Sequence, residues 1–327
     1  MGQVRVAIIG CGSIARRHIG RFMEDPDVKI AALDDIVQGQ LDKIIDTCPA
    51  LKGVPQFSDY REMLDKVELD GVLIATPHTL HFPQAMAALD AGLHVLVEKP
   101  MVCTVEHANA LIANARERGK VLEVGYQRHF SPQFIYIRDK ISSGALGEVH
   151  FVSAFQCQNW KRSTAGTWRH DPELSGGGQL GDSGSHLLDA VLWTTGFEVS
   201  TVSALIDNRG TAVDIDSALS VEFSNGAQAS ISVVGDAPTW QEDISFVGTE
   251  GALYYRNGKL FSCANKEPLV EQTEMPEGSD VNKNFIDAIL GRDEVGVPGE
   301  YGLRVAQLTQ AARESARTGK NCSVGSL

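Results

Sequence analysis

The chain has 327 residues, of which 43% are hydrophobic, so it is long enough to form two domains with substantial cores. Its formal net charge of −13 argues against the nucleic-acid backbone or an anionic membrane surface as the main partner. It has no apolar run of about 18 residues and no signal-peptide pattern, and its six scattered cysteines form no Cys-x-x-Cys pair, as is typical of reduced thiols. These features predict a soluble cytoplasmic protein.

The first 125 residues alternate apolar runs with helical patterns. Val-, Ile- and Leu-rich runs without strict alternation predict buried parallel strands over 4–10, 28–34, 70–77, 94–100 and 121–126. Apolar residues at three- and four-residue intervals predict helices over 13–25, 40–48, 58–67, 81–92 and 105–119. Repeated strand–helix units imply right-handed crossovers. Residues 1–125 are therefore predicted to form a Rossmann domain, a doubly wound parallel sheet of the α/β class.

A Gly-x-Gly-x-x-Ala string follows the first predicted strand and opens the first helix. Gly10 permits the tight turn, Gly12 lets the backbone approach a pyrophosphate, and Ala15 allows the helix to pack closely on the strand. The amino terminus of the helix then faces the anion. This context favours a dinucleotide site, which includes Ser13 and Ile14, over a structural glycine turn.

Asp34 closes the second predicted strand, where its carboxylate can accept hydrogen bonds from both hydroxyls of a ribose. The same charge would repel a 2′-phosphate, and the following Asp35 and Ile36 supply no cation for one. The sequence therefore favours NAD over NADP as cofactor. The alternative is that Asp34 is only a turn residue at the strand end.

Two further predicted strands end in polar or rigid residues. The strand over 70–77 ends in Thr76 and Pro77, with His81 in the next helix, and the strand over 94–100 carries Glu98 and Lys99 near its end. Open parallel sheets bind ligands beyond the carboxyl ends of their strands, so we expect all five at the cofactor crevice. A buried ammonium is costly without a partner, which makes Lys99 hard to explain as a packing residue. The alternative is a solvated lysine at the strand end. Pro100 could hold Lys99 through a cis bond, although a trans bond is commoner.

After about Tyr126 the pattern changes to that of a largely antiparallel, open sheet. Strands are predicted over 148–158, 200–209, 216–225, 227–236, 242–251, 252–258 and 259–263, with helices over 182–195, 281–291 and 300–318. Residues 126–327 are therefore predicted to form a C-terminal α+β domain. An open sheet with one apolar face also predicts a homo-oligomer, a dimer or a tetramer.

The stretch GGGQLGDSGSHLLD, residues 176–189, places three glycines before Asp182 and His186. Four-residue spacing puts these two side chains on one face of a helix, one turn apart. The glycines are expected to give a flexible approach that lets a loop close over a pocket. The alternative is a helix cap with a surface histidine.

With these three motifs in this order, the chain resembles the glucose-fructose oxidoreductase / inositol dehydrogenase / rhizopine catabolism (Gfo/Idh/MocA) family over essentially its whole length. The resemblance implies an N-terminal dinucleotide domain and a C-terminal domain whose open sheet commonly forms the oligomer interface. It also implies NAD(P)-dependent hydride transfer to or from a hydroxyl-bearing carbon of a sugar, an inositol or a related polyol. No metal is expected, because a hydride acceptor and a lysine need no Lewis acid.

The resemblance assigns catalytic roles to Lys99, Asp182 and His186. It places the segment of Tyr126, Gln127 and Arg128 beside the nicotinamide. It also implies substrate contacts from Tyr126, Gln156, Trp168 and Arg169 as well as from the catalytic residues. Lys99 or His186 would take the hydroxyl proton, Lys99 would stabilise the alkoxide-like charge, and Asp182 would orient the imidazole or bind a substrate hydroxyl. Substrate choice is expected to lie in the loop 159–166; the sugar, its reacting carbon and the direction stay open.

Two other functions stay open at this point. An enzyme that retains NAD and uses a transient oxidation to drive elimination or epimerisation would form product without net NADH. A nucleotide-sensing regulator would not need a proton relay, so Lys99 and His186 argue against it.

Overall fold

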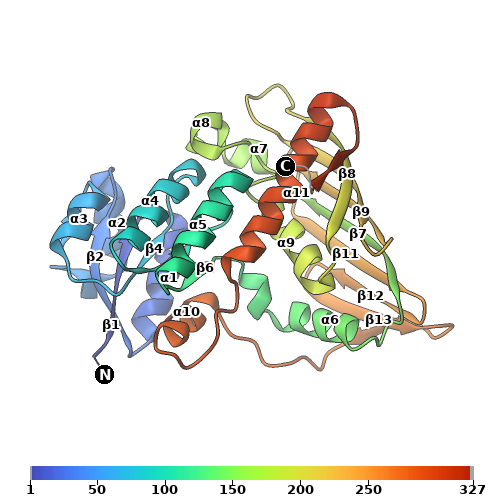
Figure 1. Cartoon of the computed structure of the whole chain (residues 1–327), viewed down its shortest axis with the longest axis horizontal. Coiled ribbons are helices and arrows are strands. Elements are labelled where there is room, and N and C mark those ends of the chain that lie inside the picture. The colour runs from blue at the N-terminus through green and yellow to red at the C-terminus, as the bar shows by residue number, and fades with distance from the viewer. Residues whose placement is uncertain (1, 325–327) are drawn as a thin grey trace. The chain divides into compact units, whose positions relative to one another are not determined.

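The structure is a computed structural model that describes residues 2–324, and the chain forms two compact units (Figure 1). Unit 1 contains the residues up to Val102, Glu106–Tyr126 and Ser279–Gly302, and unit 2 contains Cys103–Val105, Gln127–Gly278 and the residues from Leu303 onward. Sequence analysis assigned all of 126–327 to the second domain. The structure instead returns Ser279–Gly302 to unit 1.

Unit 1 is built on a six-stranded parallel sheet in the order β3-β2-β1-β4-β5-β6. Its strands are β1 (Val4–Ile9), β2 (Val28–Asp34), β3 (Gln56–Phe57), β4 (Gly71–Ile74), β5 (His94–Val97) and β6 (Leu122–Val124). The order changes direction between β1 and β4, the switch point at which doubly wound sheets bind ligands. The predicted Rossmann architecture is confirmed, and only the two-residue β3 was missed because it is too short to carry a pattern.

The helices of this unit are α1 (Ser13–Glu24), α2 (Gln38–Thr47), α3 (Tyr60–Lys66), α4 (His78–Asp90), α5 (Val105–Glu117), α10 (Val281–Ile289) and the short 3-10 helix η1 (Pro49–Leu51). Helix α1 buries Ala15, His18, Ile19 and Phe22, a stripe that recurs at three- and four-residue steps. Helix α10 begins at Asp280, whose side chain accepts hydrogen bonds from the backbone of Asn282 and Lys283. Asn282 in turn bonds His18, which explains why this late segment belongs to unit 1.

Unit 2 is built on a nine-stranded sheet in the order β14-β13-β12-β11-β7-β10-β9-β8-β15. The strands are β7 (Val149–Cys157), β8 (Val199–Asp207), β9 (Asp216–Phe223), β10 (Gln228–Val234), β11 (Gln241–Gly248), β12 (Gly251–Arg256), β13 (Lys259–Ala264), β14 (Val270–Gln272) and β15 (Cys322–Ser323). Strands β7 and β10 are parallel, and the other pairs between the described strands are antiparallel. The predicted, mostly antiparallel sheet is therefore confirmed.

The helical elements of unit 2 are η2 (Gln127–Phe130), α6 (Pro132–Ser142), α7 (Trp160–Ser163), η3 (Trp168–His170), α8 (Pro172–Ser175), α9 (Gly184–Thr195) and most of α11 (Gly299–Thr318). Helices α6 and α9 lie against one face of the sheet (Figure 1). Helix α9 begins two residues later than predicted, and α6 was not predicted. Among residues 2–324 we find no helix with the length and apolarity needed to cross a membrane.

Candidate active site

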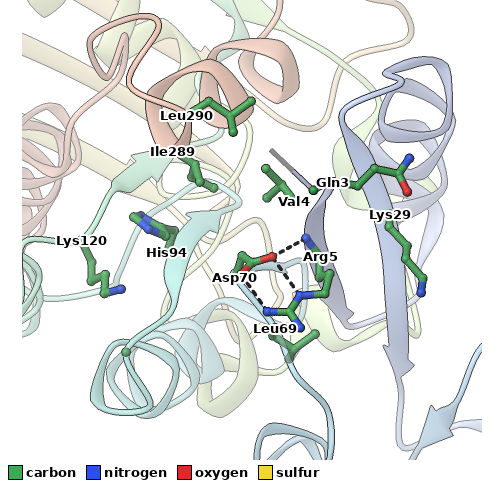
Figure 2. Close-up of a pocket in the computed structure, with 12 residues that line it drawn as sticks. Gln3, Val4, Arg5, Lys29, Leu69, Asp70, His94, Lys120, Ile289 and Leu290 are labelled. Carbon is green, nitrogen blue, oxygen red and sulfur yellow. Dashed lines mark hydrogen bonds and ion pairs between the residues drawn. The ribbon is translucent and has the colours of Figure 1, made fainter.

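A cavity of about 800 Å³ lies at the amino ends of the parallel strands of unit 1 (Figure 2). The guanidinium of Arg5 pairs there with the Asp70 carboxylate at 3.0 Å, beside His94 and Lys120. Burial, together with the charge of Lys120, lowers the pKa of His94 to about 4, so its ring is neutral at pH 7. Doubly wound sheets bind dinucleotides at the opposite, carboxyl edge. This cavity is therefore not the candidate active site.

The glycine loop between β1 and α1 has the geometry that a dinucleotide site requires. Gly10 has φ +86°, and a Cβ atom there would lie 2.7 Å from the methyl group of Thr76 and 2.8 Å from the backbone of Ala75. A Cβ on Gly12 would meet nothing within 4 Å, so open space faces the backbone where a pyrophosphate would approach. The two glycines thus fit the roles predicted for them.

Asp34, at the end of β2, has an unsatisfied carboxyl oxygen within residues 2–324. Its side chain is 4% exposed, and its buried Oδ1 has no hydrogen-bond partner among the described residues. Burial, with the charges of Asp35 and Asp59, raises the pKa of Asp34 to about 7. An unpartnered buried carboxyl oxygen is costly, and the hydroxyl groups of a ribose would satisfy it. Asp34 therefore fits NAD.

The neighbouring Asp35 has a structural role that the sequence did not indicate. Its Oδ2 accepts the backbone N–H of Cys11 at 2.8 Å, and its Oδ1 accepts the backbone N–H of Val37 at 2.8 Å. Asp35 therefore holds the glycine loop against the end of β2. Ile36, by contrast, is 83% exposed.

Thr76, Pro77 and His81, which follow β4, have different structural roles. The hydroxyl of Thr76 donates to Gln84 Oε1 at 2.6 Å, and Pro77 caps α4. The ring nitrogens of the fully buried His81 lie 2.8 Å from the carbonyl oxygen of Pro100 and 2.9 Å from that of Thr76. Burial and the nearby His78 lower the pKa of His81 to about 4. His81 thus links the residue after β4, Thr76, to Pro100.

Lys99 follows β5, and its backbone is fixed by Glu98. The Glu98 carboxyl is 4% exposed; its Oε2 accepts the backbone N–H of Lys99 at 3.1 Å and its Oε1 lies 2.8 Å from His18 Nε2. The other nitrogen of His18 lies 3.0 Å from Asn282 Oδ1. The Lys99–Pro100 bond is cis. Glu98, predicted as a cofactor contact, is therefore part of a buried network that also includes His18, which sequence reasoning missed.

Two of the three glycines before α9 are closely packed and Gly176 ends α8 with φ +67°, so the flexible approach expected from the sequence is not what the structure has. Gly177 has φ +151°, and a Cβ on Gly178 would overlap the backbone of Asp214. Arg313 donates to the carbonyl of Gly176 at 2.8 Å and pairs with Asp214 at 3.2 Å. Steric fit therefore explains Gly177, which lies against the Arg313 guanidinium, and Gly178, which lies against the backbone of Asp214.

Asp182 is anchored by two donors from the preceding loop. Its Oδ2 accepts a hydrogen bond from the Trp160 indole at 2.9 Å and from Nε of Arg169 at 2.8 Å. The guanidinium of Arg169 lies 4.4 Å from the centre of the Trp168 ring. The structure therefore brings together Asp182 and the two predicted substrate contacts of this loop, and it adds Trp160.

His186 lies in the first turn of α9 and is half-buried. Ser183, the residue before the helix, accepts hydrogen bonds from Gln156 at 2.6 Å and from Gln158. Gln156, predicted as a substrate contact, is fully buried and thus supports the start of the helix. Tyr126 is also fully buried, and Gln127 begins η2. Among the described residues, no three His, Cys, Asp or Glu side chains gather as a metal site.

Comparisons with known proteins find matches to one family in both units. Residues 4–126 match the model of an oxidoreductase family with an NAD-binding Rossmann fold, and residues 134–254 match the Gfo/Idh/MocA C-terminal domain. The chain is 27% identical to D-glucoside 3-dehydrogenase of Escherichia coli, covering 97% of this chain and 96% of the relative. It is 26% identical to scyllo-inositol 2-dehydrogenase (NAD(+)) of Bacillus subtilis, covering 77% and 73% of the two chains.

A solved structure gives the same result for the fold. The aldose-aldose oxidoreductase of Caulobacter crescentus, crystallised with glycerol, superimposes with a TM-score of 0.87 at 25% identity, covering 98% of this chain and 99% of that one. The glycine loop, the unpartnered Asp34 carboxyl and these matches lead to one conclusion. The chain belongs to the Gfo/Idh/MocA family of oxidoreductases and carries its NAD-binding domain.

Proposed function

We propose that this protein transfers a hydride between NAD and a CH–OH group of a sugar, an inositol or a related polyol. The observation that carries the proposal is that hydrogen bonds hold both the backbone of Lys99 and the carboxylate of Asp182. Glu98 fixes the backbone of Lys99, and Arg169 with Trp160 fixes the carboxylate of Asp182. Polar groups so held are typical of catalytic sites. The named relatives that act on glucosides and inositol support this substrate class.

In the proposed reaction, Lys99 and His186 act on the same hydroxyl. NAD, when bound, supplies the hydride acceptor. The ammonium of Lys99 donates a hydrogen bond to the reacting oxygen and stabilises its developing negative charge. His186 lies at the amino terminus of α9, whose field disfavours a positive ring, so its imidazole is available as a proton acceptor. We treat the two as one proton-relay unit.

Asp182 is proposed to hold the substrate loop on the start of α9. Of the two roles that the sequence left open, binding a substrate hydroxyl or orienting the imidazole, neither accounts for its bonds to Trp160 and Arg169. The bond from Arg169 Nε to the Asp182 carboxylate fixes the plane of the guanidinium. Arg169 and Trp168 are thereby placed as the proposed contacts of the substrate.

We also propose that the protein is a cytoplasmic homodimer or homotetramer assembled through the nine-stranded sheet. By register, Leu205, Ala218, Ser232 and Phe155 lie in one row across β8, β9, β10 and β7. Leu205 is 79% exposed, and Phe151, four residues before Phe155 on β7, is 36% exposed. Exposed apolar side chains on the open face of a sheet support an interface between copies. Sedimentation equilibrium tests it, and a monomer at all concentrations would contradict it.

The test of the function is a screen of NADH absorbance against inositols, aldoses, anhydrosugars and deoxysugars, with NAD and with NADP. We expect at least one polyol or sugar to give one NADH for each molecule oxidised, with NAD preferred. Product formed without net NADH would favour the redox-neutral alternative. Tight NAD binding without turnover of any member of the panel would favour a regulator.

A further inference from the structure

An arginine from a separate part of unit 2 contacts the first turn of α9. Arg128, in η2, donates a hydrogen bond from Nη1 to the backbone carbonyl of His186 at 3.2 Å. Its other terminal nitrogen, Nη2, bonds Oε1 of Glu242 on β11. The guanidinium thus bonds two acceptors from two separate nitrogens in one plane, a geometry that the single nitrogen of a lysine does not reproduce. Its position fixes the distance between the sheet and the histidine.

The Arg128–Glu242 pair is buried. The Glu242 side chain is 3% exposed and that of Arg128 is 15% exposed. The backbone N–H of Glu242 donates to the Asn257 side chain at 2.7 Å, and the Arg128 guanidinium lies 5.0 Å from the centre of the Phe134 ring. Each member therefore has neighbours that hold it in one place. A buried ion pair adds little net stability over an apolar pair of the same volume, so stability alone is a poor reason to place one here.

A second contact from the next strand reaches the same turn. Glu242 is directly opposite Gln156 in the β11–β7 ladder. Gln156 donates to the hydroxyl of Ser183, and Glu242 acts through Arg128 on His186. Two facing strand residues thus hold the first turn of α9 at two points, three residues apart. The sheet therefore sets both the position and the direction of the turn.

We propose that Arg128 and Glu242 are positioning residues, which hold the His186 imidazole in register with the reacting hydroxyl. This inference rests on the proposed role of His186 as a proton acceptor. A catalytic group that is displaced by about 1 Å can lose about 100-fold in rate while substrate still binds. We therefore expect the pair to govern kcat, with little effect on KM or on NAD affinity.

The other end of α9 offers a matched control. Arg304, in α11, donates from Nη1 to the carbonyl of Leu192 at 3.2 Å and bonds the carbonyl of Phe197. Its side chain is 17% exposed, close to the 15% of Arg128. Both arginines thus bond backbone carbonyls of the same helix, one in the first turn and one in the last. Only Arg128 is next to the candidate catalytic residue.

The experiment compares Arg128→Gln, Arg128→Lys, Glu242→Gln and Arg304→Gln with the unmodified protein, using the best sugar from the substrate screen. We expect kcat to fall roughly 10- to 100-fold in the first three and less than threefold in Arg304→Gln. The KM for the sugar and the Kd for NAD should stay within about threefold in all four. The melting temperatures of Arg128→Gln and Arg304→Gln should fall by similar amounts, so loss of stability cannot explain the difference in rate.

A double variant, Arg128→Gln with Glu242→Gln, completes the test. If Arg128 and Glu242 act through the same hydrogen-bonded pair, the kcat of the double variant should be no lower than that of the slower single variant. Equal losses of kcat in Arg128→Gln and Arg304→Gln, or an unchanged kcat in Arg128→Gln, would overturn the proposal. His186→Ala distinguishes failure of the proposed function from failure of the positioning proposal. If His186→Ala retains turnover, the proposed role of His186 is wrong. If His186→Ala is inactive and Arg128→Gln is fully active, only the positioning role of Arg128 is wrong.

Discussion

The affinity for NAD is expected to depend on pH through Asp34. Burial and two neighbouring carboxylates raise the pKa of Asp34 from 3.8 to about 7. Between about pH 4 and pH 7 the folded apoprotein therefore keeps a proton on Asp34 that the unfolded chain releases. The contribution of Asp34 to folding stability is fully present below about pH 4 and is lost as the pH rises through about 7. Ribose hydroxyls donate hydrogen bonds to the ionised carboxylate, so NAD binding favours loss of the proton.

The size of the effect follows from this pKa. If only the ionised carboxylate binds, the Kd for NAD falls about tenfold per pH unit below pH 7 and then levels off, about 100-fold in all between pH 5 and pH 8. Isothermal titration calorimetry at pH 5, 6, 7 and 8, in two buffers of different ionisation enthalpy, measures both the Kd and the proton released. Asp34→Asn should remove the slope. A flat Kd in the unmodified protein, or the same slope in Asp34→Asn, would refute the role of Asp34.

Three further predictions follow from buried or crowded positions. Glu123 is fully buried, and burial raises its pKa from 4.5 to about 9. In urea unfolding, the free energy of unfolding of Glu123→Gln should therefore equal that of the unmodified protein below pH 4.5 and exceed it by roughly 3 kcal/mol at pH 7. Equal free energies of unfolding at pH 7 would contradict this. Asp35 holds the glycine loop, whereas Ile36 is exposed and can be replaced. The double variant Asp34→Ser with Ile36→Arg should raise the ratio of kcat/KM with NADP to kcat/KM with NAD at least tenfold. An unchanged ratio would count against Asp34 as the residue that selects NAD. Gly178→Ala, whose new methyl group would overlap the backbone of Asp214, should lower the melting temperature sharply, whereas a flexible glycine approach predicts no change.

The sequence carried most of the fold because its local patterns were strong. The strands of unit 1 are buried on both faces, so their uniform apolar runs were easy to distinguish from the three- and four-residue periodicity of the helices. The glycine loop could also be predicted, since each small residue there meets a steric requirement that depends only on its neighbours along the chain. The alternating strands of unit 2 were recognisable for the same local reason.

What the sequence could not indicate depends on contacts between distant residues. His18 bonds Asn282, 264 positions away, and Arg128 bonds Glu242, 114 positions away. The family resemblance singled out the segment that contains Arg128, but no local pattern indicates which distant residue either side chain bonds. The return of Ser279–Gly302 to unit 1 and the close packing of Gly178 on Asp214 depend on the same kind of contact. A histidine on the buried stripe of α1 was the only available signal, because buried polar groups need partners.

The central claim is that Lys99 and His186 together carry the chemistry of an NAD-dependent sugar or polyol dehydrogenase. The most direct measurement is the rate of NADH formation in a single turnover by Lys99→Ala and by His186→Ala, alongside the Kd for NAD of each variant. We predict a fall of at least 100-fold in rate for both variants, with NAD affinity within about threefold of the unmodified protein. Near-normal hydride transfer in either variant, with NAD bound, would contradict the account.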